Sequence, residues 1–268
     1  MLEERDGEHV ATPSFLVIGA MKSGTTTLHR TLEQHPEIYG SAKKEIHFFD
    51  RHYDNGMRWY EEWFTPGPGH VASGESCPEY MFAPWARERI VADLPDTRFL
   101  VVLREPVSRA YSQYMMNRLK GLEPIETFEK AVDLEERRIS RGARRRQLLF
   151  SYVRRSRYIE DLLWWEERVG RERLHVFLMD DMTREPVPTM ARVFDFLGVD
   201  PAFSEAIELG HWKRGKSPDI RSLPDSDAVV PYDRINPGTE ARLRSGFRES
   251  NLALQGWLGR PLTSWIDR

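Results

Sequence analysis

Short runs of consecutive apolar residues alternate along this chain with longer stretches in which apolar residues recur at helical spacing. The run at 15–20 (FLVIGA) is followed by such a stretch at 25–34. The run at 98–103 (RFLVVL) is followed by another at 107–118, after a proline that suits a first helical turn. Continuous apolar runs are typical of parallel strands that are buried on both faces. The pattern therefore predicts repeated units of strand, turn and helix.

A third unit of the same kind lies nearer the C-terminus. The apolar run at 174–179 (LHVFLM) precedes a helical stretch from about 188 to 197, which ends at Gly198. Two further helical stretches, at about 125–141 and 156–168, lie between the second and third predicted strands. Strands that alternate with helices indicate an α/β fold. We expect a central parallel sheet flanked by helices.

The length and composition favour one domain. The chain has 268 residues, of which 40% are hydrophobic, and this is enough for one well-buried core. We expect residues 1–12 to form a flexible N-terminal tail and residues 13–268 to form the domain. Residues 210–238 are rich in proline, glycine, aspartate and serine, and predict a long loop before a last helix at about 239–257. Long loops within compact domains are often functional.

Charge and cysteine content limit the class of protein. The net charge of −3 argues against a nucleic-acid partner, because phosphate contacts require a basic excess. Cys77 is the only cysteine, so an intrachain disulfide and a cysteine-rich zinc site are both excluded, which fits a reducing compartment. The first twelve residues, MLEERDGEHVAT, lack the apolar core of a signal peptide, and no run is long enough to span a membrane. We therefore expect a cytoplasmic protein without a membrane partner.

The segment between the first strand and its helix has the features of a phosphate-binding loop. Residues 19–26 read GAMKSGTT, and backbone N–H groups at the start of a helix favour an anion. The glycine spacing matches the loop of nucleoside triphosphatases, but Thr25 stands where that loop has its lysine, and Lys22 comes earlier. The usual lysine reaches the β- and γ-phosphates. A ligand with two 5′-linked anionic groups therefore fits this loop better than a triphosphate.

A second anion site is indicated after the second strand. Arg104 stands at the carboxyl end of that strand, where open α/β sheets bind ligands, and its guanidinium is a forked donor for phosphate. Ser108 and Ser112 lie one turn apart on the following helix, so either hydroxyl could assist. An arginine and a serine at this spacing are weak evidence by themselves. Together with the loop they indicate a ligand with two separate anionic ends.

These motifs lead to a family resemblance that covers nearly the whole chain. The segment PSFLVIGAMKSGTTTLHRTLEQHP resembles the 5′-phosphosulfate-binding loop of sulfotransferases that use 3′-phosphoadenosine-5′-phosphosulfate (PAPS), and KKEIHFFD resembles the next segment of the heparan sulfate N- and 3-O-sulfotransferase branch. The similarity continues through REPVSRAYSQYMMNR, SRYIEDLLWW, LHVFLMDD, FLGV and NLALQGWLGRPLTSW. It implies a P-loop-like sulfotransferase fold. It also implies sulfuryl transfer from PAPS, without a metal, to a hydroxyl or less readily an amine of a carbohydrate or small metabolite.

The resemblance also implies which residues bind the donor. Lys22 would contact the bridging region of the phosphosulfate, and Arg104 and Ser112 would bind the 3′-phosphate. A short basic segment in the long late loop resembles the one that folds over the nucleotide, although a solvated loop is an equal alternative. The residues implied to contact PAPS, or its product 3′,5′-adenosine bisphosphate (PAP), are Lys22, Ser23, Gly24, Thr25, Thr26, Thr27, Arg104, Ser112, Trp212, Arg214, Gly215 and Lys216.

Glu45 is the predicted general base, because similar heparan sulfate enzymes have a glutamate at the corresponding place. An extended backbone would place Glu45 and His47 on one face, and Asp50 could orient either side chain. His47 is therefore the competing base. Two plainer alternatives remain open: Glu45 pairs with Lys43 or Lys44, and His47 is a packed histidine.

One motif departs from the resemblance. Similar 3-O-sulfotransferases have glutamate, lysine, threonine and proline where this chain has Glu75, Ser76, Cys77 and Pro78. The lysine that has a catalytic role in that branch is absent, so membership of that specificity class does not follow. The donor-binding motifs are intact.

Two other classes of function are compatible with the loop. A P-loop kinase or nucleoside triphosphatase would use Asp180 or Asp181 to hold magnesium, but Thr25 in the lysine position counts against it. If the chain were a non-catalytic nucleotide-binding module, Glu45 and His47 would have no function in it. The arginine-rich stretch at 137–157 is either a solvated helix face or a surface that faces an anionic acceptor.

Overall fold

A computed structural model describes residues 3–5, 8–10, 12–140, 143–208 and 235–267. Within it the chain forms two compact units. The first, which we call the sheet unit, comprises residues 1–103 and 164–214. The second, the helical unit, comprises residues 104–163 and 215–268.

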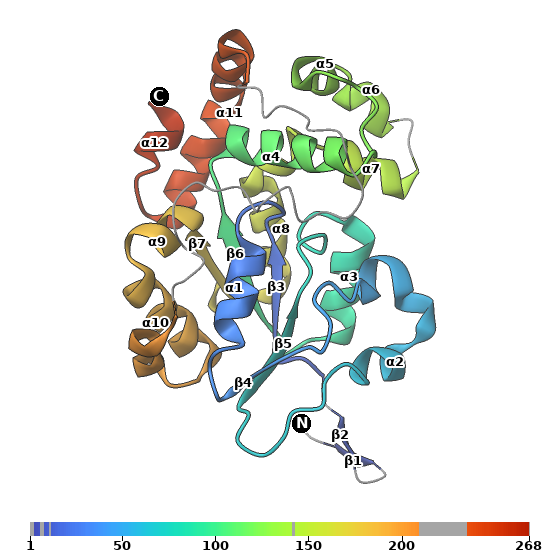
Figure 1. Cartoon of the computed structure of the whole chain (residues 1–268), viewed down its shortest axis with the longest axis vertical. Helices are drawn as coiled ribbons and strands as arrows, with labels where there is room; N and C mark the ends of the chain where they lie inside the picture. The colour runs from blue at the N-terminus through green and yellow to red at the C-terminus, as the bar shows by residue number, and fades with distance from the viewer. Residues whose placement is uncertain (1–2, 6–7, 11, 141–142, 209–234, 268) are drawn as a thin grey trace. The chain divides into compact units, whose positions relative to one another are not determined.

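The sheet unit contains a five-stranded sheet whose strand order is β4-β5-β3-β6-β7 (Figure 1). Every neighbouring pair of strands is parallel. The strands are β3 (Phe15–Gly19), β4 (Ile38–Gly40), β5 (Ala72–Ser76), β6 (Arg98–Leu103) and β7 (Leu174–Leu178). The predicted α/β fold with a central parallel sheet is confirmed, and the three apolar runs are its strands β3, β6 and β7.

Helices and short turns complete the sheet unit. They are α1 (Thr25–Leu32), a π-helical turn η1 (Phe48–His52), η2 (Tyr53–Asn55), α2 (Met57–Glu61), α3 (Pro84–Asp93), η4 (Arg171–Arg173), α9 (Met179–Arg184), α10 (Pro186–Leu197) and η5 (Pro201–Ala206). Near the N-terminus, β1 (Glu3–Arg5) and β2 (Glu8–Val10) form an antiparallel pair. The division into a tail and a domain remains a prediction.

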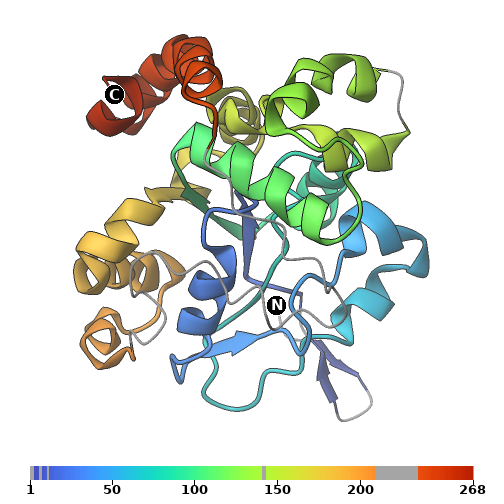
Figure 2. The same ribbon diagram turned by 45° about the horizontal axis from the view of Figure 1, so that its top comes forward.

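The two faces of the sheet have separate cores. On one face, Phe15 and Val17 of β3 belong to the same buried cluster as Leu28 of α1 and Phe194 of α10. Figure 1 shows α1 lying across this face, and in both views α9 and α10 lie together beside β7 (Figures 1 and 2). On the other face, the Phe99 ring lies 4.9 Å from the ring of Trp165, which is also fully buried. Burial on both faces explains why β3 and β6 are apolar throughout.

Strand β5 is the buried strand that the hydrophobic pattern does not predict, since its sequence is ASGES. Gly74 pairs with Phe15 of β3, and a β-carbon at Gly74 would lie 2.3 Å from the Phe15 carbonyl oxygen. Only glycine permits this approach of the two backbones. The other side chains of the strand are small or polar, and they are buried as well. Burial of polar residues removes the apolar signal on which the prediction depends.

The helical unit has its own hydrophobic core, in which residues of α4 (Pro106–Leu119) cluster with Phe128, Tyr152 and Phe247, which follow it in the chain. Arg109 of α4 is fully buried, and it donates hydrogen bonds to Ser156 Oγ at 2.7 Å and to Gln113 Oε1 at 2.9 Å. The remaining elements are α5 (Phe128–Asp133), α6 (Glu135–Ser140), α7 (Arg144–Phe150), η3 (Arg154–Ser156), α11 (Pro237–Leu258) and α12 (Thr263–Ile266). Helix α8 (Tyr158–Val169) begins in this unit and ends in the sheet unit.

A histidine in β7 predicts acid sensitivity of the sheet unit. Burial, with smaller contributions from the charges of Arg192 and Arg171, lowers the pKa of His175 to about 4. The unfolded chain takes up this proton near pH 6.5, so the folded state loses stability as the pH falls from about 6.5 to about 4. We expect His175→Phe to remove about 2 kcal/mol of that loss.

The measurement is urea unfolding of the wild type and of His175→Phe at pH 7 and at pH 4.5. His70→Gln, which removes an exposed histidine, is the control. An unchanged difference in stability between the two pH values would show that His175 does not limit acid stability.

Candidate active site

The loop between β3 and α1 combines an open helix end with a buried hydroxyl. Gly24 is the N-cap of α1 and has φ 95°, a left-handed conformation that favours glycine. It has no side chain with which to cap the helix, so the N-cap residue itself supplies no side-chain acceptor for the N–H groups of the first turn. Lys22 also has a positive φ, of 68°. The backbone thus turns sharply twice within the predicted phosphate-binding loop.

Ser23 is the most informative residue of this loop. Its Oγ is buried and has no hydrogen-bond partner among the described residues. A buried hydroxyl without a partner is unfavourable, and an oxyanion that accepts its proton would remove the penalty. Thr25 is buried, Thr26 is exposed and Thr27 is half-buried at the start of α1. The residues present therefore fit the phosphosulfate end of the predicted donor.

The segment that carries Glu45 is bonded along the end of β5. The Glu45 N–H donates to the Ser76 carbonyl at 3.1 Å, and the Ile46 N–H donates to Glu75 Oε2 at 3.1 Å. Glu45 and His47 both have φ 59°. The expected extended backbone is wrong, because each residue lies in the left-handed region. Hydrogen bonds to β5 hold this conformation, which local sequence does not favour for either residue.

The side chains of Glu45, His47 and Asp50 nevertheless lie next to one another, with His47 between the two carboxylates. His47 Nε2 lies 3.8 Å from Glu45 Oε2, and His47 Nδ1 lies 3.0 Å from Asp50 Oδ2. The Asp50 carboxylate is fully buried, whereas the Glu45 side chain is 40% exposed. Glu45 also forms an ion pair with Lys44, one of the two lysines named as alternatives. Asp50 thus orients His47, and Glu45 stands at the solvent end of this group.

Glu75 holds this segment in place by a hydrogen bond to its backbone. The sequence analysis did not predict it as a site residue. It accepts hydrogen bonds from the hydroxyls of Tyr60 at 2.8 Å and Tyr80 at 2.9 Å, in addition to the Ile46 N–H. Burial raises the pKa of Glu75 to about 7, and these hydrogen bonds oppose the shift. The three donors come from separate parts of the chain, so no local spacing could have identified the cluster.

Ser76, which stands where similar enzymes have a lysine, is bonded to a histidine. Its Oγ lies 3.1 Å from His29 Nδ1, and both residues are buried. Burial, with smaller contributions from the charges of Lys44 and Arg30, lowers the pKa of His29 to about 4. The Ser76–His29 pair is therefore neutral near pH 7. The nearby positive charge comes from Lys44 and not from a lysine at position 76.

The residues predicted to bind a 3′-phosphate lie in the helical unit. Arg104 directly follows β6, and its carbonyl accepts a hydrogen bond from the Tyr158 hydroxyl at 2.7 Å. The Ser108 hydroxyl donates to Glu105 Oε2 at 2.7 Å, and this carboxylate caps α4. The half-buried Ser112 has no side-chain hydrogen bond to the described residues. Of the two candidate hydroxyls, Ser112 is thus the one left for a ligand.

Two further predictions concern other parts of the chain. Trp212, Arg214, Gly215 and Lys216 all lie outside the described residues. Asp181, a candidate magnesium ligand of the kinase alternative, accepts a hydrogen bond from the Leu178 N–H at 3.0 Å. Its carboxylate therefore caps the first turn of α9, and this local role accounts for its position after β7.

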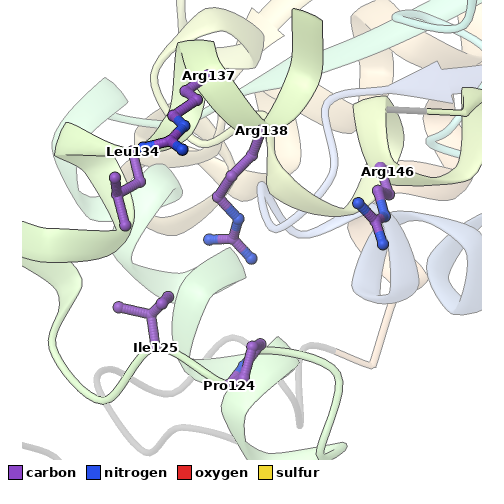
Figure 3. Close-up of a pocket in the computed structure, with 6 residues that line it drawn as sticks. All are labelled: Pro124, Ile125, Leu134, Arg137, Arg138 and Arg146. Atoms are coloured by element: carbon purple, nitrogen blue, oxygen red, sulfur yellow. The ribbon is translucent and has the colours of Figure 1, made fainter. Parts of the chain in front are cut away.

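The arginine-rich stretch borders a hollow of about 340 Å³ in the helical unit (Figure 3). Arg138 is committed to the fold, because it donates to both oxygens of Glu123, at 2.8 and 3.0 Å, and its guanidinium lies 3.5 Å from the centre of the Phe150 ring. Arg137 and Arg146 are exposed at the rim. The hollow is lined by Pro124, Ile125, Leu134, Arg137, Arg138 and Arg146. Of the three arginines that line the hollow, one is thus structural and two are exposed.

Comparison with known proteins identifies the class of this protein. Residues 12–213, more than half of the chain, match the sulfotransferase domain family, and the chain belongs to that family. Among solved structures it is similar to a sulfotransferase from Alicyclobacillus acidocaldarius, with 29% identity and a TM-score of 0.74 over 96% of this chain and 99% of that one. The fold also matches mouse sulfotransferase SULT7A1 complexed with PAP, at 16% identity and a TM-score of 0.53 over 94% and 96% of the two chains.

The curated relatives are also sulfotransferases. The chain is 31% identical to human heparan sulfate glucosamine 3-O-sulfotransferase 5, over 72% of this chain and 55% of that protein. It is 24% identical to the membrane-associated sulfotransferase kil1 of Dictyostelium discoideum, over 95% and 67% of the two proteins. The chain thus spans about half the length of the human 3-O-sulfotransferase that it matches. Within the part of the chain that the structure describes, no helix is both long and apolar enough to cross a bilayer.

Proposed function

We propose that this chain is a PAPS-dependent sulfotransferase that transfers a sulfuryl group to a hydroxyl of an acceptor. The observation that carries the proposal is the β3–α1 loop. It joins an uncapped helix end, Lys22 and the unpartnered buried hydroxyl of Ser23 in the same unit as the group of Glu45, His47 and Asp50. An anion-binding loop and a candidate base within one unit support a transfer reaction rather than binding alone.

The donor is a substrate in this proposal, and it supplies the activated sulfuryl group. Lys22 and the N–H groups of α1 stabilise the negative charge that develops on the leaving phosphate as the bond from sulfur to the bridging oxygen breaks. Gly24 allows the backbone to approach the anion, and the hydroxyls of Ser23 and Thr25 to Thr27 donate to its oxygens. Arg104 and Ser112 bind the 3′-phosphate, which ATP does not have.

The acceptor hydroxyl attacks sulfur, and its proton passes to the Glu45 carboxylate. His47 is a positioning residue in this scheme, since Asp50 holds its Nδ1 edge and its Nε2 edge points toward Glu45. The ion pair with Lys44 holds the Glu45 carboxylate in position. Because the carboxylate is partly exposed, an acceptor can reach it from solvent. PAP leaves with the electron pair of the broken bond.

A carbohydrate is the acceptor class best supported by the relatives, one of which is named for heparan sulfate. A small hydroxylated metabolite is the second candidate, because Ser76 replaces the lysine of the 3-O-sulfotransferase motif. We expect the acceptor atom to be a hydroxyl oxygen rather than an amine nitrogen, since one carboxylate base is enough to take the proton of a hydroxyl. A cytoplasmic location remains part of the proposal, supported by the presence of a single cysteine.

The donor assignment is tested by thermal unfolding with different nucleotides. PAP should raise the melting temperature well above any effect of ATP with magnesium, because only PAP offers a 3′-phosphate to Arg104 and Ser112. Arg104→Ala should weaken PAP binding by about 1.5–3 kcal/mol, the usual contribution of a charge-assisted hydrogen bond, and adenosine 5′-monophosphate binding much less.

Arg248→Ala, which removes an exposed arginine of α11, is the matched control and should bind PAP as the wild type does. Equal stabilisation of the wild type by PAP and by ATP with magnesium would refute the assignment of PAPS as the donor. If Arg104→Ala retains the preference for PAP over the monophosphate, then Arg104 is structural and the 3′-phosphate is bound elsewhere.

A further inference from the structure

Three potential metal ligands of different chemical types converge beside the candidate base. His47, Asp50 and Cys77 each offer one ligand atom, and these atoms all lie within 4.8 Å of one another. His47 Nδ1 is 3.0 Å from Asp50 Oδ2 and 3.4 Å from Cys77 Sγ. The thiol and the carboxylate are fully buried, and the imidazole retains 14% exposure. An ion could therefore reach the cluster past the imidazole.

The two distances from His47 Nδ1 are close to those of a zinc site. Four ligands arranged tetrahedrally around zinc at its usual bond lengths lie about 3.3–3.6 Å apart. The distances from His47 Nδ1 to the other two donors fall within a few tenths of an ångström of that range. Nitrogen, oxygen and thiolate sulfur together form a donor set that suits zinc and other late divalent transition metals, whereas magnesium and calcium prefer oxygen alone.

The surroundings hold these ligands in place. The Cys77 N–H donates to the Val17 carbonyl of β3 at 3.0 Å, which anchors the thiol at the sheet. Arg51 Nε lies 3.2 Å from Asp50 Oδ2 and orients the carboxylate. Glu45 lies on the opposite edge of the imidazole, 3.8 Å from His47 Nε2. Metal-bound histidines usually donate their other N–H to a carboxylate, and Glu45 is a carboxylate on that side of the ring.

We propose that His47 Nδ1, Asp50 and the Cys77 thiolate form an inhibitory site for Zn²⁺, with the fourth position open to water. Binding displaces the thiol proton to solvent and fixes His47 as the tautomer that carries hydrogen on Nε2. That N–H faces Glu45 Oε2, which lies 3.8 Å away, and competes with the acceptor hydroxyl for the carboxylate. The inhibition rests on the proposed function of Glu45, whereas the metal site itself does not.

Metal binding is tested with Co²⁺ alone, because a cobalt–thiolate bond gives a near-ultraviolet charge-transfer band. Cys77 is the only thiol of the chain, so any such band reports this site. The wild type should show the band, Zn²⁺ should displace it, and Cys77→Ser and Cys77→Ala should both lack it. His52→Asn, which removes an exposed histidine of the same η1 segment, should keep it. No band with the folded wild type overturns the proposal.

Inhibition is tested separately, as the ratio of turnover with added Zn²⁺ to turnover with EDTA in each variant. Any change in basal turnover cancels in this ratio. We expect Zn²⁺ to lower turnover at least about 100-fold in the wild type, the lower end of the usual contribution of a general base, and not in Cys77→Ser. A cobalt band without inhibition would retain the site and refute its link to Glu45. Equal inhibition of Cys77→Ser would place the inhibitory ion elsewhere. Absence of any sulfuryl transfer would refute the proposed function and leave the cobalt result standing.

Discussion

Glu45→Gln should lower turnover about 100- to 10,000-fold, the usual contribution of a general base, while PAP binding stays close to that of the wild type. Glutamine keeps the size of the side chain and most of its hydrogen bonds but has no useful proton affinity. The Glu45 side chain is 40% exposed and its backbone is held by Ser76, so the substitution should leave the fold intact. The loss should therefore appear in the chemical step.

The measurement is single-turnover sulfuryl transfer with saturating PAPS and an acceptor that the wild type sulfates, together with PAP titration. Glu62→Gln, which alters an exposed carboxylate, is the control. His47→Asn provides the comparison that assigns the base. A loss equal to that of Glu45→Gln indicates a coupled pair, and a deeper loss moves the base to His47. Near-normal turnover of Glu45→Gln would refute the mechanism even if the chain transfers sulfuryl groups.

Lys22→Ala should reduce both donor affinity and turnover, unlike Glu45→Gln. The ammonium contacts the phosphosulfate before transfer and stabilises charge on the leaving phosphate during transfer. Loss of a charged hydrogen bond should weaken PAPS binding by about 1.5–3 kcal/mol. Turnover at saturating PAPS should fall about 100-fold in addition. The positive φ of Lys22 adds no strain to alanine beyond that of lysine.

This result is checked by PAPS titration and by single-turnover transfer, with Lys43→Ala as the matched control. Lys43 is an exposed lysine of the same unit, and its ammonium lies 5.7 Å from the centre of the Trp63 ring. A Lys22→Ala enzyme with unchanged PAPS affinity would exclude direct contact between this lysine and the donor. Unchanged turnover with reduced affinity would restrict Lys22 to binding.

The hydrophobic pattern alone was sufficient for the three sheet strands that are continuous apolar runs. Strands β3, β6 and β7 are predicted because each is a continuous apolar run, and the helices that follow them have apolar residues at helical spacing. The anion-binding loop is equally local, since strand, glycine, lysine and helix are consecutive. Burial along a continuous segment and the conformation of one loop depend mainly on neighbouring residues, which the sequence displays directly.

Strand β5 and the cluster around Glu75 depended on the tertiary structure. The strand ASGES carries no apolar run, and its place between β4 and β3 follows from the close approach that Gly74 allows. The two tyrosines that bond Glu75 come from positions 60 and 80, and the backbone that it holds is at Ile46. Such a cluster depends on which distant segments meet, and residue spacing does not encode that.

The sequence by itself determined the family, the anion-binding loop and the identity of Glu45, His47 and Asp50 as one group. Tertiary structure decided how that group is arranged: left-handed backbone at two of its residues, Asp50 against one edge of the imidazole, and Cys77 beside the same edge. It also distinguished Ser112 from Ser108, whose hydroxyl is used by the cap of α4. The physical reason is the same throughout. Residue type sets what chemistry a side chain can perform, whereas its partners are set by the packing of segments that lie far apart in the chain.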